Sequence, residues 1–97
     1  MGFKVVIADS AIDDLREIVA YIARDDPQVA VRVGNKLIDY ALTLAAFPER
    51  CPFFDEARGI RKAVAAPYLI FFTVGHAPPA SVNVIHFWHG ARRYPQF

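Results

Sequence analysis

The hydrophobic pattern of this chain changes its period once, near residue 48, and this change constrains the fold more than any other feature. Before that point, apolar residues recur every three or four positions, as on the buried face of a helix. After it, three short segments rich in β-branched and aromatic residues follow one another, separated by Pro and Gly. The pattern predicts an α+β domain in which the helices come first and most of the sheet comes last.

One strand and one helix are expected at the start of the chain. The β-branched segment Phe3–Ala8 predicts a strand. Ser10 is a suitable N-cap with Asp13 three residues later, so we expect the first helix to begin there and to end near Arg24. The apolar residues that recur at helical spacing, and that should be buried, are Leu15, Ile18 and Ile22.

A second helix is expected directly afterwards, and the two form an antiparallel hairpin. Asp26 is placed to cap it, Pro27 occupies the first helical position, and the helix can continue to about Phe47. Gly34 in its interior costs up to about 1 kcal/mol relative to Ala, which close packing against the first helix would explain. The predicted buried stripe comprises Ala30, Val33, Leu37, Ala41 and Leu44, widened by Ile38, Leu42 and Ala45.

The second half predicts an antiparallel meander. After a loop over residues 48–59, the expected strands are Ile60–Ala66, Tyr68–Val74 and Ser81–Trp88, with short Pro-containing connections between them. The predicted order is β-α-α-β-β-β in one domain spanning residues 1–97. The helical hairpin should pack on one face of a small, mostly antiparallel sheet, and the other face, with its Arg and aromatic side chains, should stay open.

The composition limits the cellular location of the protein and the kinds of site that it can contain. No apolar run reaches the 18 residues that a membrane-spanning helix needs, and no signal-peptide pattern is present, so we expect a cytoplasmic protein. Cys51 is the single cysteine, so neither a disulfide framework nor a Cys-based metal site is expected, and no cofactor is expected. An apolar content of 55% in 97 residues suggests that some of this surface meets another protein.

Charge is distributed unevenly along the chain. All ten Asp and Glu residues lie at or before Glu56, where they face six Lys and Arg residues, whereas residues 57–97 carry five cations and no acid. The total of +1 therefore conceals a balance of −4 in the first part and +5 in the second. This asymmetry predicts a cationic working surface supported by an acidic scaffold, suited to an anionic partner.

The cations fall into two groups. Arg61 and Lys62 lie at the start of the first strand of the meander, and Arg92 and Arg93 lie just past the end of its third strand. If opposite strand termini come together, these residues converge into one site, in which Arg binds a phosphate or carboxylate bidentately and Lys adds a point charge. The alternative is that they solvate an exposed sheet face or pair with the nearby acids of the preceding loop.

Three further side chains are candidates for chemistry. His86 and His89 are three positions apart on one strand, so an extended chain points them to opposite faces and they do not make a joint metal site. His89, beside the Arg pair, is the better candidate for a general acid or base, with a structural hydrogen-bonding role as the alternative. Tyr94 is suited to stacking on a base or donating to a phosphate, or else to fixing the C-terminus on the sheet.

Taken in order, these sequence segments resemble the RelE/ParE superfamily of type II toxin–antitoxin toxins. The sequences of the helices and of the final His-Gly-Ala-Arg segment are most similar to the ParE branch. The matching stretches cover nearly the whole chain, and their order and spacing are more specific than any single piece. They are Ala11-x-x-Asp14-Leu15-x-x-Ile18-x-x-Tyr21-Ile22-Ala23, Asp26-Pro27-x-x-Ala30, Phe47-Pro48, Gly59-Ile60-Arg61-Lys62, Tyr68-Leu69-Ile70-Phe71-Phe72, Val82-x-Val84 and His89-Gly90-Ala91-Arg92.

The resemblance implies a small toxin that a cognate antitoxin neutralises with an amphipathic segment. ParE-like members poison DNA gyrase without known chemistry of their own, whereas RelE-like members are ribosome-dependent mRNA endonucleases. In a nuclease, His89 would be the base, Arg61 and Arg92 would hold the phosphate, and Tyr94 would orient the substrate. In a gyrase inhibitor, the target-binding residues would be Arg61, Lys62, Arg92, Arg93 and Tyr94.

The modest net charge favours the ParE-like alternative. Ribosome-directed members of the family tend to be strongly basic, while this chain carries +1 and has no Lys- or Arg-rich helix. The sequence therefore predicts a gyrase-inhibiting toxin. A ribosome-dependent endonuclease and a degenerate, non-toxic binding module of the same fold are the two alternatives.

Overall fold

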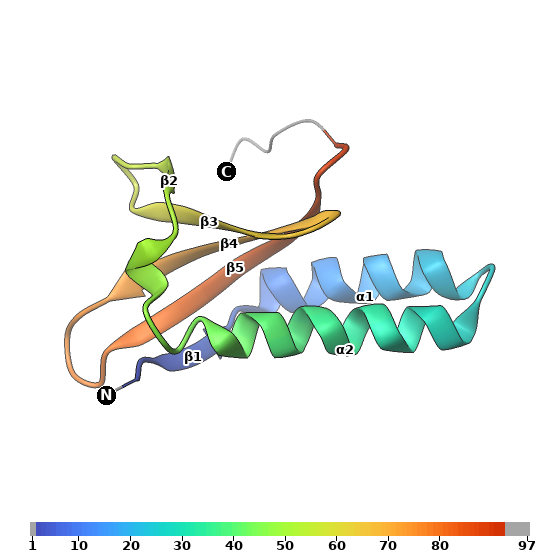
Figure 1. Cartoon of the computed structure of the whole chain (residues 1–97), viewed down its shortest axis with the longest axis horizontal. Coiled ribbons are helices and arrows are strands. Elements are labelled where there is room, and N and C mark those ends of the chain that lie inside the picture. The colour runs from blue at the N-terminus through green and yellow to red at the C-terminus, as the bar shows by residue number, and fades with distance from the viewer. Residues whose placement is uncertain (1, 93–97) are drawn as a thin grey trace.

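The computed structural model describes residues 2–92, which form a sheet covered on one face by two antiparallel helices (Figure 1). The chain begins with β1 (Lys4–Ile7), α1 (Asp9–Ala23) and α2 (Pro27–Thr43). A short 3₁₀ helix, η1 (Pro48–Arg50), then leads to β2 (Phe53–Asp55), β3 (Ile60–Ala65), β4 (Tyr68–Gly75) and β5 (Ser81–His89). The predicted α+β order is confirmed, and β2 is an additional edge strand within the segment expected to be a loop.

The five strands lie in the order β1-β5-β4-β3-β2. β1 pairs in parallel with the first half of β5, and every other pairing is antiparallel, as the prediction of a mostly antiparallel sheet requires. A bulge opposite Phe71 and Phe72 interrupts the pairing of β4 with β5. Because β1 pairs only as far as Val84, the outer edge of β5 beyond that residue is left to α1.

The start of α1 differs from the prediction. The helix begins at Asp9, directly after β1, and its N-cap residue Ala8 supplies no side-chain hydrogen bond. The Ser10 hydroxyl instead donates to the backbone oxygen of Ile85 at 2.6 Å, so the expected capping role of Ser10 is wrong. The physical reason is tertiary: this hydroxyl satisfies a carbonyl on the edge of β5 that β1 does not reach.

The ends of α2 follow local rules to different degrees. Asp26 accepts hydrogen bonds from the backbone N–H groups of Gln28 and Val29, and Pro27 takes the first position, as predicted. The helix ends at Thr43, however, and not near Phe47. The backbone oxygen of Ala45 accepts a hydrogen bond from Phe3 N–H at 2.8 Å, so the chain leaves the helix where it meets the start of β1.

The main core lies between the helices and the sheet. Leu37 and Leu44 of α2 are buried against it, while Leu15, Ile18 and Val33 are partly buried at its border. Gly34 faces α1 closely enough that an added Cβ would lie 3.0 Å from Val19 Cγ2, which confirms close helix packing as the reason for this glycine. The residues of this cluster are Ala11, Leu37, Ala41, Leu44, Ala63, Ala65, Ile70, Phe72, Val82, Val84 and Phe87.

The opposite face of the sheet carries a second, smaller cluster, so the expectation of an open face is wrong for its centre. Phe71 is fully buried there, with the Phe54 ring packed edge-on at 4.7 Å between centroids. Phe54 therefore packs on this face of the sheet. The other members of this cluster are Ile60, Leu69, Ile85 and Trp88.

Candidate functional site

Asp14 of α1 covers the edge of β5 that β1 leaves unpaired. Its Oδ2 accepts a hydrogen bond from the backbone N–H of Phe87 at 3.2 Å and lies 2.7 Å from Nδ1 of His86. Since an ionised carboxylate only accepts hydrogen bonds, Nδ1 is the protonated nitrogen of His86. This half-buried pair joins α1 and β5.

In His89, unlike His86, the Nδ1 atom accepts a hydrogen bond. Its Nδ1 accepts a hydrogen bond from the backbone N–H of Ala91 at 3.1 Å, so the neutral ring carries its proton on Nε2. The edge of the His89 ring contacts Tyr68, with centroids 5.2 Å apart. Burial raises the pKa of the Tyr68 phenol, which keeps this hydroxyl neutral and able to donate.

Gly90 fixes the turn that presents His89. Its backbone N–H donates to the Pro67 oxygen at 2.7 Å, and a Cβ at this position would lie only 2.9 Å from the same oxygen. A side chain would therefore push apart the end of β5 and the β3–β4 turn. Beyond it, the Arg92 N–H donates to the His89 oxygen, and the Arg92 guanidinium lies 5.5 Å from the centre of the Trp88 ring.

A pocket of about 540 Å³ opens between α1 and the C-terminal end of β5. It is lined by Asp14, Glu17, Ile18, Tyr21, Tyr68, Phe87, His89 and Arg92. Tyr21 is 71% exposed on its rim. The pocket thus combines two carboxylates, one guanidinium, one imidazole and two phenols around an apolar floor.

Sequence reasoning identified His89 and Arg92 in this pocket but missed the contribution of α1. Asp14, Glu17 and Tyr21 recur at helical spacing, so one face of α1 carries all three. Only the pairing of β1 with β5 shows that this face lies beside the end of β5.

The other predicted site residues lie elsewhere. Arg61 pairs across the sheet at the level of Phe72 and Val84, whereas His89 pairs with Tyr68 five positions further along β5. At about 3.3 Å per residue, this offset is roughly 16 Å. The first and third strands of a meander run in the same direction, so the start of one and the end of the other lie at opposite ends of the sheet. Arg61 and Arg92 therefore do not converge.

Arg61 instead organises the loop before β2. Its guanidinium donates to the backbone oxygens of Glu49 and Cys51, the latter at 2.7 Å, and it stacks over the Phe53 ring at 3.9 Å. Burial raises the pKa of the Cys51 thiol, and the charge of Arg61 offsets this only in part. Cys51 is thus a protonated, half-buried thiol, as expected for a cysteine without a chemical role.

The remaining predicted residues are placed as follows. Lys62 lies beside Arg61 on β3, opposite Phe71, and is partly buried. Arg93 and Tyr94 lie outside the described residues. Within residues 2–92, no group of three His, Cys, Asp or Glu side chains is arranged to hold a metal ion, and no helix is long and apolar enough to span a bilayer.

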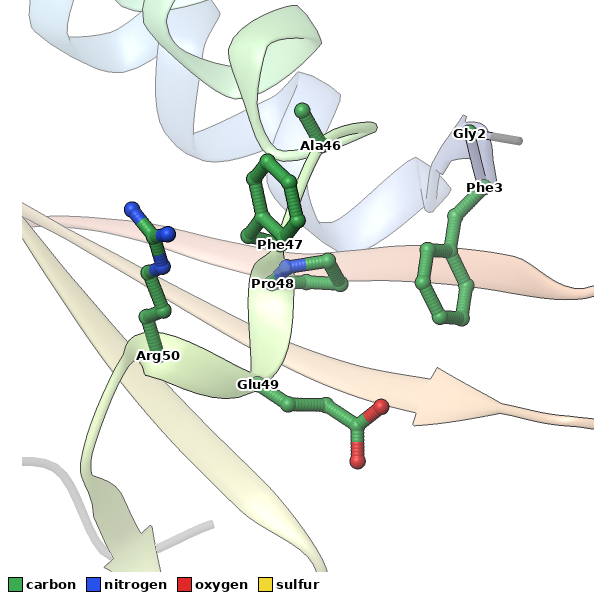
Figure 2. A pocket seen from close by; sticks show the side chains of 7 residues that line it. All are labelled: Gly2, Phe3, Ala46, Phe47, Pro48, Glu49 and Arg50. Carbon is green, nitrogen blue, oxygen red and sulfur yellow. The ribbon is translucent and has the colours of Figure 1, made fainter.

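A second pocket, of about 680 Å³, lies at the end of α2 (Figure 2). Phe47 adopts a left-handed backbone conformation with φ of 54° and is 67% exposed, while Arg50 stacks on its ring at 4.5 Å. Glu49 lies 3.6 Å from His76, whose ring contacts Phe3 edge-on. These contacts join η1 to the β4–β5 loop and to the start of the chain.

Comparison with known proteins places the chain in a family. The sequence profile of the ParE toxin of type II toxin–antitoxin systems (parDE) matches residues 5–94, and the chain belongs to this family. It is a toxin of the ParE/RelE class. Among curated protein sequences, none matches it significantly.

Two solved structures share the fold. A chain of the chromosomal ParDE toxin–antitoxin system from P. aeruginosa superposes with a TM-score of 0.73 at 15% identity, covering 90% of this chain and 95% of that chain. A chain of the toxin–antitoxin complex RelBE2 from Mycobacterium tuberculosis gives a TM-score of 0.65 at 18% identity, covering 92% and 99%. Both support the RelE/ParE fold assigned from the sequence.

Proposed function

We propose that this protein is a ParE-like toxin that inhibits DNA gyrase by binding it, and that a cognate antitoxin neutralises it in the cytoplasm. The observation that carries the proposal is the match to the ParE profile along nearly the whole chain. The geometry of the candidate site supports binding over chemistry in two respects.

The first respect is that, within residues 2–92, no cluster of cations surrounds His89. A ribonuclease needs positive charge where the phosphorane develops, together with a base and an acid. Arg92 is the one cation that lines the pocket beside His89 within residues 2–92, and two carboxylates lie in the same pocket. Arg61, the other phosphate-binding candidate, is held by backbone oxygens at the opposite end of the sheet.

The second respect is the tautomer of His89. Because Nδ1 accepts the Ala91 N–H, the neutral ring presents Nε2–H, which donates a hydrogen bond and cannot accept a proton. His89 is thus prepared to bind an acceptor on a partner, and not to act as the general base of RNA cleavage.

The proposed target-binding surface is the end of β5 with its continuation. Arg92 lines the pocket and its guanidinium lies 5.5 Å from the centre of the Trp88 ring, and Arg93 and Tyr94 follow it in the sequence. Arg61 and Lys62 would meet the target only if the contact extends to the far end of the sheet. Exposed Tyr21 adds an aromatic contact on the same side as Arg92.

An antitoxin partner is proposed from the structural neighbours, both of which come from toxin–antitoxin systems. An amphipathic antitoxin segment would cover exposed apolar side chains and direct its acids toward the cations of the sheet half. The toxin should then be poorly tolerated alone and stable in the complex.

One observation favours the ribonuclease alternative. His89, Tyr68 and Arg92 line the same pocket, so an acid, a phenol and a phosphate-binding group are within one small volume. The alternative therefore requires the Ala91 contact to break, or His89 to serve as the acid.

The decisive experiment compares purified wild-type protein with His89→Gln in two assays. We expect wild-type protein to inhibit supercoiling by gyrase, to leave ribosome-bound mRNA uncut, and to lose little activity in the variant. Site-specific mRNA cleavage that falls by about 10²–10⁴-fold in His89→Gln would contradict the proposal, since that is the usual contribution of a general acid or base. Inactivity in both assays and in growth tests would identify a non-toxic binding module instead.

A further inference from the structure

α2 carries a second apolar stripe beside its buried one. Each residue of this stripe directly follows a residue of the buried face, and it is therefore rotated by about 100° around the helix axis. The stripe consists of Val31, Asn35, Ile38 and Leu42, which follow Ala30, Gly34, Leu37 and Ala41. We call these four residues the α2 seam.

The α2 seam is largely uncovered. Val31 is 60% exposed and Leu42 is 52% exposed, while Ile38 is partly buried. The expectation that Leu42 widens the buried stripe is therefore wrong. In Figure 1, α1 and the sheet lie on one side of α2 only, and its other side forms the lower border of the molecule.

The spacing of the α2 seam is that of a helix-pairing surface. Its residues recur at intervals of four, three and four, which is the a/d pattern of two helices packed side by side. Asn35, which is exposed, is the one polar residue among them.

Charges flank the α2 seam on its solvent side only. Arg32 and Asp39 are seven residues apart and follow Val31 and Ile38. Both are exposed, and within residues 2–92 neither forms an ion pair. The opposite flank consists of buried residues that face α1 and the core, so a partner helix would meet charge on a single side.

From this arrangement we propose that the α2 seam binds the α2 seam of a second copy of this chain, with the two helices antiparallel. When Val31 lies opposite Leu42 of the second copy, Asn35 lies opposite its Ile38, and both contacts recur by symmetry. Arg32 directly follows Val31 and Asp39 directly follows Ile38, so in this register Arg32 of each copy lies beside Asp39 of the other. Two reciprocal ion pairs close the exposed flank, which is the isologous arrangement of a two-fold dimer.

The self-complementary charges are the reason to choose a second copy as the partner. A helix of another protein would need an acid opposite Arg32 and a base opposite Asp39, whereas this chain supplies both from one helix. The 17-residue helix is only about 25 Å long, and so the contact belongs to the small and transient class of interfaces. We therefore expect dimers that form reversibly at about 10–100 µM chain.

The test uses two charge reversals in the full chain. Arg32→Asp puts acids on both positions of the flank, and Asp39→Arg puts bases on both, so each homodimer gains two repulsive pairs. Each variant should associate about tenfold more weakly than wild type in sedimentation equilibrium, as expected for exposed pairs changed from attraction to repulsion. An equimolar mixture of the two variants should associate as well as wild type, because all its pairs are attractive again.

Arg16→Asp is the control, because this exposed cation lies on α1 and not beside the α2 seam. It should associate as wild type does. A wild-type chain that stays monomeric at about 1 mM, about tenfold above the upper end of the expected range, would overturn the proposal, as would a variant mixture that stays monomeric. If the wild-type chain is monomeric and Leu42→Asp abolishes antitoxin binding, the antitoxin and not a second copy occupies the α2 seam.

Discussion

Truncation of Leu37 should reveal how much stability the contact between α2 and the sheet provides. Leu37 is 2% exposed and lies in the main core among side chains from the sheet. Leu42 lies on the same helix, in the same chemical class, and is 52% exposed. The pair Leu37→Ala and Leu42→Ala therefore separates burial from helix propensity, since both exchanges replace the same residue in the same element.

The magnitude follows from the atoms that are removed. Leucine loses three carbon groups on truncation to alanine, and at about 0.8 kcal/mol for each buried group the transfer contribution is about 2.4 kcal/mol. The cavity left in a packed core adds to this, so Leu37→Ala should lower the free energy of unfolding by about 2–5 kcal/mol. Leu42→Ala should cost about 1 kcal/mol or less, because half of its surface is already in water.

The measurement is urea unfolding followed by circular dichroism, at a protein concentration low enough to keep the chain monomeric. If the free energy of unfolding falls with urea concentration at the same slope in both variants, both expose the same surface area on unfolding. The midpoints of unfolding then report differences in stability alone. A loss below 1 kcal/mol for Leu37→Ala, or a loss at Leu42 that equals it, would show that the buried face of α2 has been assigned wrongly.

Four further outcomes are expected. Asp14→Ala should cost about 1–3 kcal/mol in urea unfolding, because it removes the carboxylate that accepts from Phe87 N–H and contacts His86 Nδ1. Asp13→Ala, at the exposed neighbouring position, should cost under about 0.5 kcal/mol, and equal losses would refute this role of Asp14. Gly34→Ala should stabilise the protein by about 0.5–1 kcal/mol more in a Val19→Ala background than in wild type, and a double-mutant cycle without coupling would exclude the close contact of the two helices. Cys51 should react with a disulfide reagent more slowly than a free thiol at pH 8, because its raised pKa leaves less thiolate. The folded state should then lose stability as the pH rises above the ordinary thiol range, since the unfolded chain releases this proton first, and wild-type behaviour in Cys51→Ala would contradict that link.

Local signals predicted the elements well where the backbone alone decides them. Asp26 and Pro27 start α2 because an acceptor and a fixed φ suit the first helical turn in any context. Ser10 carries the same kind of signal, yet its hydroxyl is used by Ile85 on β5. A capping residue next to a strand has two possible partners, and only the parallel pairing of β1 with β5 decides between them.

The convergence of the cations was a different kind of error, because the sequence contained enough information to avoid it. Short connections already imply that β3 and β5 run in the same direction on either side of β4. Arg61 at the start of one and Arg92 beyond the end of the other must then lie far apart. The prediction failed because it did not take into account the direction of the strands in the meander, and not because of any property of the residues.

The fold brings together charges that are separated along the chain. Residues 57–97 contain no acid, which suggested a purely cationic surface. The end of β5, however, lies against α1, so Asp14 and Glu17 from the acidic part of the chain line the same pocket as His89 and Arg92. A separation of charge in sequence thus becomes a mixture of charge in space. A partner that fits this pocket therefore offers both an acceptor to Arg92 and a donor to Glu17. A ligand that carries only negative charge would place that charge beside the Glu17 carboxylate of the pocket and be repelled by it.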